Sequence, residues 1–194
     1  MKRVFFVTAL SMGVFFAHAQ RTHTDAAFGV KGGLNVSNVS VENSTNPDSK
    51  VSVNLGIFAH VHLDRMVAFQ PELLFSGQGF KQTISGVDVT TSLNYITLPI
   101  LLQLMAGDGF RFETGPQPGI LVSAHDKANG NSSDAKDDFK SADFSWVFGV
   151  GYIGHAGFGV DARYNLGLSN INDVSSTKVH NRVFAIGVFY QFRR

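Results

Sequence analysis

A two-residue alternation of side chains constrains the fold more than any other feature of this 194-residue sequence. The alternation recurs in eight segments. In each, every second residue is apolar and often aromatic, while the residues between are glycines, amides and charged side chains. Successive side chains of a β-strand point to opposite faces, so this period is typical of strands rather than helices. We therefore predict strands within residues 28–37, 52–63, 67–79, 93–106, 110–122, 143–154, 158–169 and 184–192.

The chemistry of the two faces predicts which of them is outside. A soluble barrel buries its apolar face and exposes its polar one. Here the apolar face is almost unbroken and rich in the chain's 18 Phe residues, whereas the other face suits a narrow interior because it is rich in glycine. The segments are also close to the roughly 9–11 residues that a tilted transmembrane strand needs. We predict an all-β fold, an eight-stranded antiparallel up-and-down transmembrane β-barrel with its apolar face against lipid.

The connections between the segments alternate in length. Tight turns occur at 63–65, 106–109 and 154–157, and longer connections at 39–50, 81–90, 124–142 and 169–180. Outer-membrane barrels have short periplasmic turns and longer extracellular loops, and eight strands with both ends in the periplasm need three of the former and four of the latter. A soluble β-sandwich has no reason to sort its loops in this way.

Aromatic residues of the apolar face gather near both ends of the segments, as expected for belts at the two membrane interfaces. Near the short turns and termini we expect Phe28, Phe69, Phe110, Phe112, Tyr152, Phe158, Tyr190 and Phe192. Nearer the long loops we expect Phe75, Phe144, Trp146 and Phe184.

The stretch LNYITLPILLQLMA, residues 93–106, is the most apolar part of the chain outside its N-terminus. As a helix it would be about 21 Å long, too short for the roughly 30 Å of hydrocarbon in a bilayer. As a strand it directs Ile96, Leu98, Ile100, Leu102 and Leu104 to lipid. Pro99 lacks the amide that a ladder bond requires, so we expect a local bulge or a lumen water there.

The N-terminus, MKRVFFVTALSMGVFFAHAQ, has the order of a secretory signal peptide: two basic residues, an apolar stretch and an A-x-A cleavage site at 17–19. We divide the chain into a signal peptide (1–19), a short N-terminal segment (20–26) and an outer-membrane β-barrel (27–194). Cysteine is absent, so the exported protein has no disulfide. With 16 basic and 15 acidic residues, the chain does not have the charge of a nucleic-acid-binding protein.

Polar side chains on the inward face are the candidate site. Buried charges must be paired, so we expect one mutually bonded lumen network that holds the barrel together. Its predicted members are Lys31, His60, His62, Gln70, Glu72, Arg111, Glu113, Gln117, Asp161 and Arg163. Since eight-stranded barrels usually have a filled interior, we predict no appreciable ion conductance, although a path for a small solute is the alternative.

Other chemistry is less well supported by the spacing. His60 and His62 share a face, but no motif supplies a third metal ligand. The connection after 124 contains Asp126, Asn129, Asn131, Asp134, Asp137 and Asp138, whose spacing does not match a calcium loop. A lipase or deacylase needs Ser, His and an acid at one rim, and no spacing identifies such a triad. We predict no enzyme, no cofactor and no metal.

Five stretches in order, GVKGGLNVSNV, QPELLFSGQG, NYITLPILLQ, ETGPQPGILV and DARYNLGLSNI, resemble the PorT-like outer-membrane β-barrel family of Bacteroidetes. The resemblance covers nearly the whole exported chain and implies a small barrel. The founding member of that family is linked to protein secretion across the outer membrane. Gly187, Tyr190 and Phe192 resemble the C-terminal signal read by the barrel-insertion machinery, although Ala185 replaces the usual polar residue and Arg193 and Arg194 follow.

The sequence thus predicts an exported protein of a Gram-negative outer membrane, acting as a structural or interaction protein of the cell envelope through long extracellular loops. An accessory barrel of a secretion system and an outer-membrane lipid-modifying enzyme are the alternatives. The expected partners are outer-membrane lipid, the barrel-insertion machinery and other envelope or secretion proteins, with no nucleic acid.

Overall fold

The computed structural model describes residues 26–42, 47–84, 86–174 and 177–192. The predicted signal peptide and the segment before Ala26 lie outside these residues. The strands are β1 (Ala26–Val41), β2 (Asp48–His62), β3 (Val67–Ile84), β4 (Val87–Thr97), β5 (Ile100–Ala106), β6 (Phe110–Ala128), β7 (Asn131–Asp134), β8 (Ala142–Ile153), β9 (Phe158–Gly167) and β10 (Val179–Gln191), with a short 3-10 helix, η2 (Lys136–Asp138). No helix in the described part of the chain is long and apolar enough to cross a membrane.

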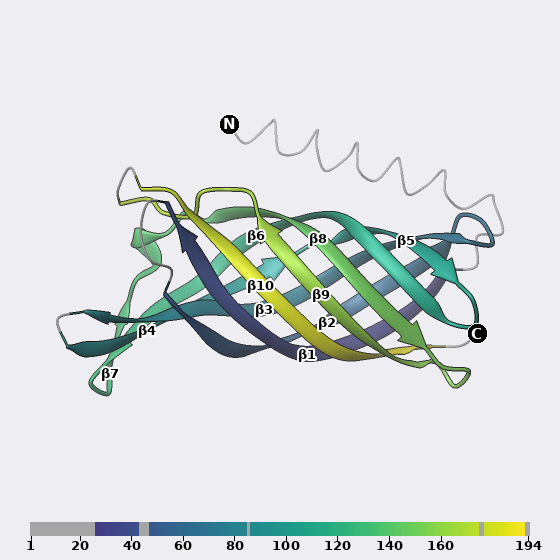
Figure 1. Ribbon diagram of the computed structural model, residues 1–194, viewed down its shortest axis with the longest axis horizontal. Coiled ribbons are helices and arrows are strands. Elements are labelled where there is room, and N and C mark those ends of the chain that lie inside the picture. The colour runs from purple at the N-terminus through teal and green to yellow at the C-terminus, as the bar shows by residue number, and fades with distance from the viewer. Residues whose placement is uncertain (1–25, 43–46, 85, 175–176, 193–194) are drawn as a thin grey trace, which may run out of the picture.

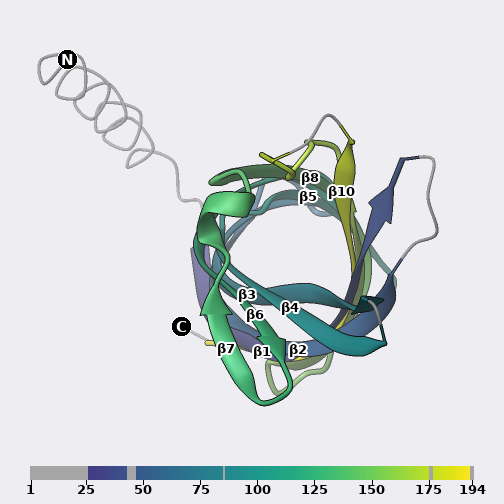
Figure 2. The ribbon, with the colours of Figure 1, turned by 90° about the vertical axis from the view of Figure 1, so that its left-hand side faces the viewer.

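The strands close into an antiparallel ring with eight strand positions (Figures 1 and 2). We call each position around the barrel wall a stave. β4 and β5 follow one another along a single stave, and both pair with β3 and with β6. The ring closes because β1 pairs with β10 on one side and with β2 on the other. β7 is a short strand paired only with the end of β6. The predicted eight-stranded up-and-down barrel is confirmed.

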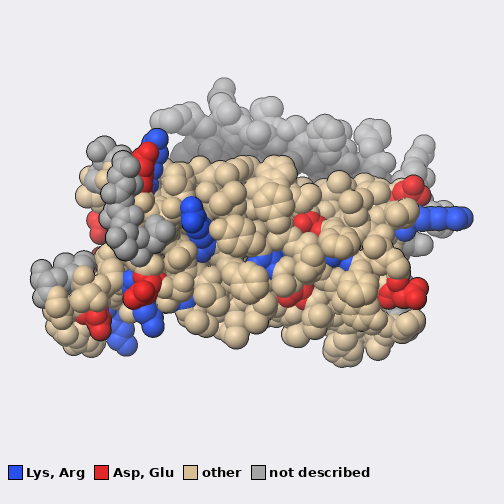
Figure 3. Space-filling model, in the orientation of Figure 1, with Lys and Arg blue, Asp and Glu red and all other residues tan. Residues whose placement is uncertain are grey.

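Exposure alternates along the staves as the two predicted faces require. On β2, for example, Val51, Val53 and Leu55 are exposed. Asn54, which lies between Val53 and Leu55, and Phe58, further along the strand, are buried. The side of the barrel seen in Figure 3 is accordingly mostly uncharged between two charged ends. Lipid can cover such a wall at no cost to its hydrogen bonds, because the closed ring leaves no sheet edge.

Pro99 separates β4 from β5 without changing the register. Leu74 pairs with Thr97 on one side of Pro99, and Pro71 pairs with Ile100 on the other. Neither β3 nor the β4–β5 stave therefore contains an extra residue between these pairs. The bulge predicted at Pro99 is therefore wrong, and the lumen water given as its alternative stays a prediction. Glu72 N still donates to Pro99 O at 2.9 Å, and only the return bond is lost. The register of this stave shifts instead at Asn94 and Tyr95, opposite Ser123 and Leu121 of β6.

Two inward phenylalanines show why glycine recurs on the lumen face. A Cβ added to Gly29 would lie 2.2 Å from the Phe58 ring, and one added to Gly159 would lie 2.1 Å from the Phe189 ring. Phe58 and Phe189 meet edge to face with their ring centroids 5.8 Å apart. Glycine on neighbouring strands thus makes room for aromatic rings inside a narrow barrel.

At the long-loop end the polarity of the two faces reverses. Beyond Val36 of β1, Asn38 and Ser40 point outward while Val39 and Val41 pack inside. On β4, Leu93 and Tyr95 are likewise buried inside. These strand ends extend past the apolar band, where water replaces lipid outside and an apolar interior is favoured, as in a soluble barrel.

The predicted connection at 81–90 is mostly paired strand, since Lys81 pairs with Thr90 and Thr83 with Asp88. Strand also covers 39–41, 48–50, 124–128 and 131–134. The long connections are thus partly hairpins, which project from the left-hand end of the barrel in Figure 1.

Candidate functional site

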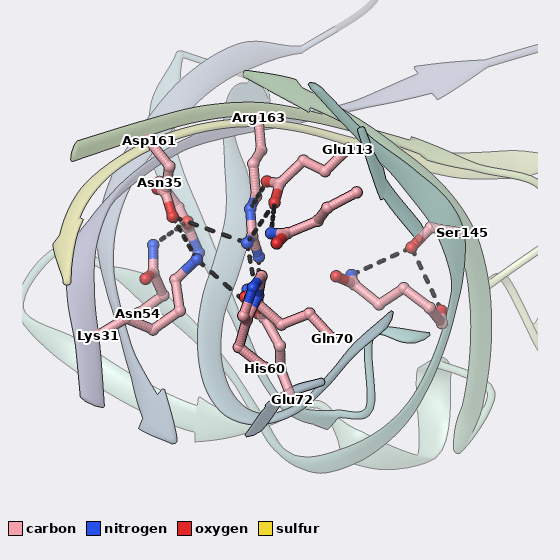
Figure 4. A network of polar contacts seen from close by, with 12 residues as sticks. Lys31, Asn35, Asn54, His60, Gln70, Glu72, Glu113, Ser145, Asp161 and Arg163 are labelled. Atoms are coloured by element: carbon pink, nitrogen blue, oxygen red, sulfur yellow. Dashed lines mark hydrogen bonds and ion pairs between the residues drawn. The ribbon is translucent and has the colours of Figure 1, made fainter. Parts of the chain in front are cut away.

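Arg163 lies at the centre of the lumen, between the carboxylates of two other staves (Figure 4). Its Nη1 and Nη2 donate to the two oxygens of Glu72 at 2.6 and 2.7 Å. Its Nε donates to Glu113 Oε1, and Nη2 reaches Glu113 Oε2 at 3.2 Å. A planar guanidinium suits this role because it presents its donors in a rigid fork. Arg163 therefore ties β9 to β3 and β6 across the barrel.

Lys31 extends the network to β1. Its Nζ donates to Asp161 Oδ2 at 2.5 Å and lies 3.8 Å from Glu72 Oε2. Together with Arg111, which lies nearer the short-turn end, the network contains three buried cations and three buried anions: Lys31, Arg111, Arg163, Glu72, Glu113 and Asp161. These six charges balance one another, which lowers the cost of burying them together. Asp143 is a further buried anion nearer the long-loop end, where it accepts hydrogen bonds from Ser169 and Asn181.

Two amide groups also donate to the glutamates, and an imidazole contacts one of these amides. Gln70 donates to Glu72 at 2.7 Å and Gln103 donates to Glu113 at 2.8 Å. His60 Nδ1 lies 3.2 Å from Gln70 Oε1. The carboxylates are thus held from several sides, which fixes their positions.

Toward the short-turn end, Arg111 donates to Gln191 at 3.0 Å and its guanidinium carbon lies 5.6 Å from the centre of the Phe189 ring. Gln117 lies elsewhere in the lumen and donates to Ser145 at 3.1 Å. His62 is exposed at the end of β2, and its ring stacks edge to face on His60 with the centroids 4.6 Å apart. Of the ten predicted lumen residues, His62 is the one that the structure places outside the buried interior.

Sequence reasoning missed a second polar group of the lumen. Asn54 donates to Asn35 at 2.6 Å, and Asn35 donates to Ser76 at 3.0 Å. Gln103, which bonds Glu113, was also missed. All four lie on the predicted inward face, so the alternation alone could have found them, but the prediction favoured charged residues.

It also missed an apolar cluster that fills the lumen at the long-loop end. Its buried members are Val39, Phe80, Leu93, Tyr95, Leu121, Ala124, Ala135 and Ile171. Ala135 and Ile171 come from the connections, which fold into the mouth: Ala135 N donates to Ala124 O, and Lys140 N donates to Ile171 O. The predicted polar lumen is therefore polar only in part.

Both halves of the lumen are packed with side chains. A polar cavity beside Thr97, Asn165 and Arg163 leaves about 20 Å³ for the centres of water molecules, room for one or two. Thr97 Oγ1 and Asn165 Oδ1 are buried there without a protein partner, which makes them natural water ligands. A structural role for the lumen network stays a prediction.

Little in the described residues supports other chemistry. No group of three or more potential metal ligands is found within them, so His60 and His62 have no third partner there. Asp126 accepts a bond from Thr91, and Asp134 accepts one from Lys136 N. Ser169 donates to Asp143, but no described histidine hydrogen-bonds this pair.

Five of the eight rings predicted for the aromatic belt at the short-turn end are in contact with one another. Phe110 meets Tyr152 with centroids 5.1 Å apart, Phe158 meets Tyr190 at 4.6 Å, and Tyr190 meets Phe192 at 5.4 Å. Tyr190 and Phe192 thus belong to this belt, and Gly187 lies inward, close to Asp161. Their role as an insertion signal stays a prediction.

Comparison with known structures agrees with this architecture. Neisserial surface protein A superposes with a TM-score of 0.60 at 16% identity, over 86% of this chain and 99% of its own. Ail, the attachment invasion locus protein of Yersinia pestis, gives 0.53 at 15% over 86% and 99%. OprG of Pseudomonas aeruginosa gives 0.53 at 15% over 89% and 98%. At such low identity the likeness shows the fold alone.

Sequence comparison is decisive for the family. No curated protein matches the chain in sequence. A family model described as "Outer membrane protein beta-barrel domain" matches residues 17–173, most of the chain. The outer-membrane location predicted from the alternation is thereby confirmed, and the chain belongs to the outer-membrane β-barrel domain family.

Proposed function

We propose that this protein is a non-enzymatic interaction protein of the cell envelope, which acts through the hairpins at its long-loop end. The observation that carries the proposal is the packed lumen. A charge-balanced network fills its middle and an apolar cluster fills its outer end, so side chains occupy the place of a transport path. The surface that remains for function is the one outside the membrane.

The two ends of the barrel differ in a way that supports this proposal. At one end the staves are joined by tight turns. At the other, β3 and β4 continue as a hairpin, and β6 and β7 form a second one that ends at Asn129 and Gly130. Paired strands present side chains in fixed positions, which suits recognition of a partner.

Site-specific crosslinking tests the proposal. A photoreactive side chain at Asn129, on the tip of the β6–β7 hairpin, is compared in intact cells with one at Asp108, in the tight turn between β5 and β6. We expect adducts with other envelope proteins at 129 and none at 108. Adducts at 108 alone would overturn the proposal, because they place the partner on the periplasmic side.

A second candidate, an accessory barrel of a protein secretion system, is favoured by the stretches that resemble the PorT-like family of Bacteroidetes. It predicts the loss of exported proteins from the medium of a deletion strain. The lipid-modifying enzyme predicts a changed lipid A in the same strain. One deletion strain, examined for secreted proteins and for lipid A, therefore separates the three.

A further inference from the structure

The outer faces of β1, β9 and β10 define where the apolar band ends at the long-loop end. On β10 the outward side chains run from Tyr190 through Val188 and Ile186 to Phe184, all apolar or aromatic. The next outward residue is Arg182, which is exposed. The apolar band of β1 ends in the same way, at Val36, with Asn38 after it.

Arg182 has polar and aromatic neighbours but no acidic one. Its register partners are Asn38 on β1 and Leu166 on β9. Phe184 and Tyr164, which pair with each other next to it, are 47% and 40% exposed. Within the described residues Arg182 forms no ion pair, and the outward positions of these three strands hold no Asp or Glu. The Arg182 guanidinium is therefore unpaired beside an aromatic surface.

At the edge of the apolar band, an exposed arginine without a protein carboxylate is free to bind an anion outside the protein. Arginine on that wall is costly at mid-membrane but tolerated near the interface, where it reaches the headgroups. A guanidinium binds phosphate with two parallel hydrogen bonds, and an amide such as that of Asn38 can donate a third. Rings immediately below such a site pack against the acyl chains of the same lipid.

We propose that Arg182 and Asn38 form a binding site for the phosphate of a lipid headgroup, in the leaflet at the long-loop end. The site lies on the lateral surface, away from the hairpin tips. It rests on the outer-membrane location and not on the proposed interaction function, so either can fail without the other.

The single tryptophan offers a local readout. Trp146 lies on the outer face of β8 and pairs with Leu166, which pairs with Arg182. The backbones of Trp146 and Arg182 are therefore about 10 Å apart, across two strand spacings. The full barrel is reconstituted in phosphatidylcholine bilayers with increasing fractions of phosphatidylglycerol or phosphatidylcholine that carries brominated acyl chains. Quenching of Trp146 fluorescence gives the relative binding of the two lipids near it.

We expect brominated phosphatidylglycerol to bind about fivefold better than phosphatidylcholine, the ratio typical of one basic side chain at an anionic surface. R182Q should reduce this ratio to about one. R182K should keep part of the preference, since it retains the charge without the fork. The matched controls R65Q, in the turn at the other end, and K178Q, in the connection before β10, should keep the full ratio.

An unchanged ratio in R182Q would overturn the proposal. An equal loss in R65Q or K178Q would do the same, because the preference would then come from overall charge. Inorganic phosphate added at up to about 50 mM should leave the ratio unchanged. If it abolishes the preference, the site takes free phosphate and the assignment to a lipid is wrong.

Discussion

Arg163 is the residue on which the lumen network depends most, because it alone bonds both Glu72 and Glu113. Arg163→Met keeps much of the volume but leaves Glu113 without its ion-pair partner and Glu72 with only Lys31, 3.8 Å away. We expect it to lower the free energy of unfolding by about 3–5 kcal/mol, the usual cost of breaking a buried ion pair from one side. Urea unfolding in lipid vesicles, followed by Trp146 fluorescence, measures it.

The control for this prediction is Arg65→Met, since Arg65 is exposed in the turn after β2 and should change the free energy by less than about 0.5 kcal/mol. Arg163→Met combined with Glu113→Gln should recover part of the loss, because one uncompensated charge is removed. An Arg163 variant as stable as the Arg65 variant would show that the network does not hold the staves together.

Gly159 tests the packing of aromatic rings on glycine. In Gly159→Ala the new Cβ would lie 2.1 Å from the Phe189 ring and 2.6 Å from Tyr152 O. The ring must move in a crowded lumen, so we expect a loss of about 1–3 kcal/mol in unfolding free energy. Gly32→Ala is the matched control, because its Cβ would meet nothing closer than 3.5 Å. Equal effects of the two substitutions would contradict the packing account.

Alternation in the sequence predicts which side chains share the lumen but not which of them meet. Glu113 and Arg163 are 50 residues apart, and Lys31 and Asp161 are 130 apart. Their contacts depend on the register of every stave between them, and a shift of one residue would turn each side chain to the other face. The sequence therefore predicted most of the side chains that belong to the lumen network, but it did not predict which of them form hydrogen bonds or ion pairs with one another.

At the scale of elements, Pro99 lies between β4 and β5, but the two strands keep one register against β3. Its carbonyl accepts from Glu72 N, so a residue with an amide at 99 would complete a two-bond pair. In Pro99→Ala we expect that amide to be as protected from hydrogen exchange as that of Leu98, which donates to Pro118 O. The free energy of unfolding should change by less than about 1 kcal/mol, since the new bond is offset by a freer unfolded chain.

Exchange at residue 99 as fast as in an exposed turn would contradict this account, because it would mean that the wall is open at this point. The bulge expected here from the sequence was wrong for a simple reason. Proline removes one donor, but its fixed φ is compatible with extended backbone, so the register need not change.

Strand ends beyond the membrane were the elements least accessible to sequence reasoning. The prediction used one polarity pattern, apolar outward, for each whole strand. Val39 and Phe80 reverse that pattern because their strands leave lipid there, so the stretches around them were interpreted as loops. A search for reversed alternation after each apolar band would have found these ends.

Surface proteolysis distinguishes a paired hairpin from a loose loop. Asn129 and Gly130 have positive φ at the turn between β6 and β7, while Ala135 is buried in the apolar cluster. We expect protease added to intact cells to cut first at 129–130 and to spare the chain around Ala135, as mass spectrometry of the fragments would show. First cleavage around Ala135 would mean that the connection does not fold into the mouth.

For the whole molecule, the fold followed from sequence because three independent signals agreed: alternation, segment length and the sorting of connections. Each reflects a requirement of the bilayer, so together they leave few alternatives. Function is not subject to the same requirement. The barrel is a scaffold shared by proteins of different roles, and the site alone distinguishes them.

The central claim is that this outer-membrane barrel is closed, with a charge-balanced network and an apolar cluster filling its lumen. Single-channel recording of the purified protein in planar lipid bilayers tests it most directly. We expect insertion, checked by the heat-dependent gel mobility of the folded barrel, without discrete current steps, because a filled eight-stranded barrel leaves no water-filled path. Large, stable current steps of uniform size from the folded protein would contradict the account.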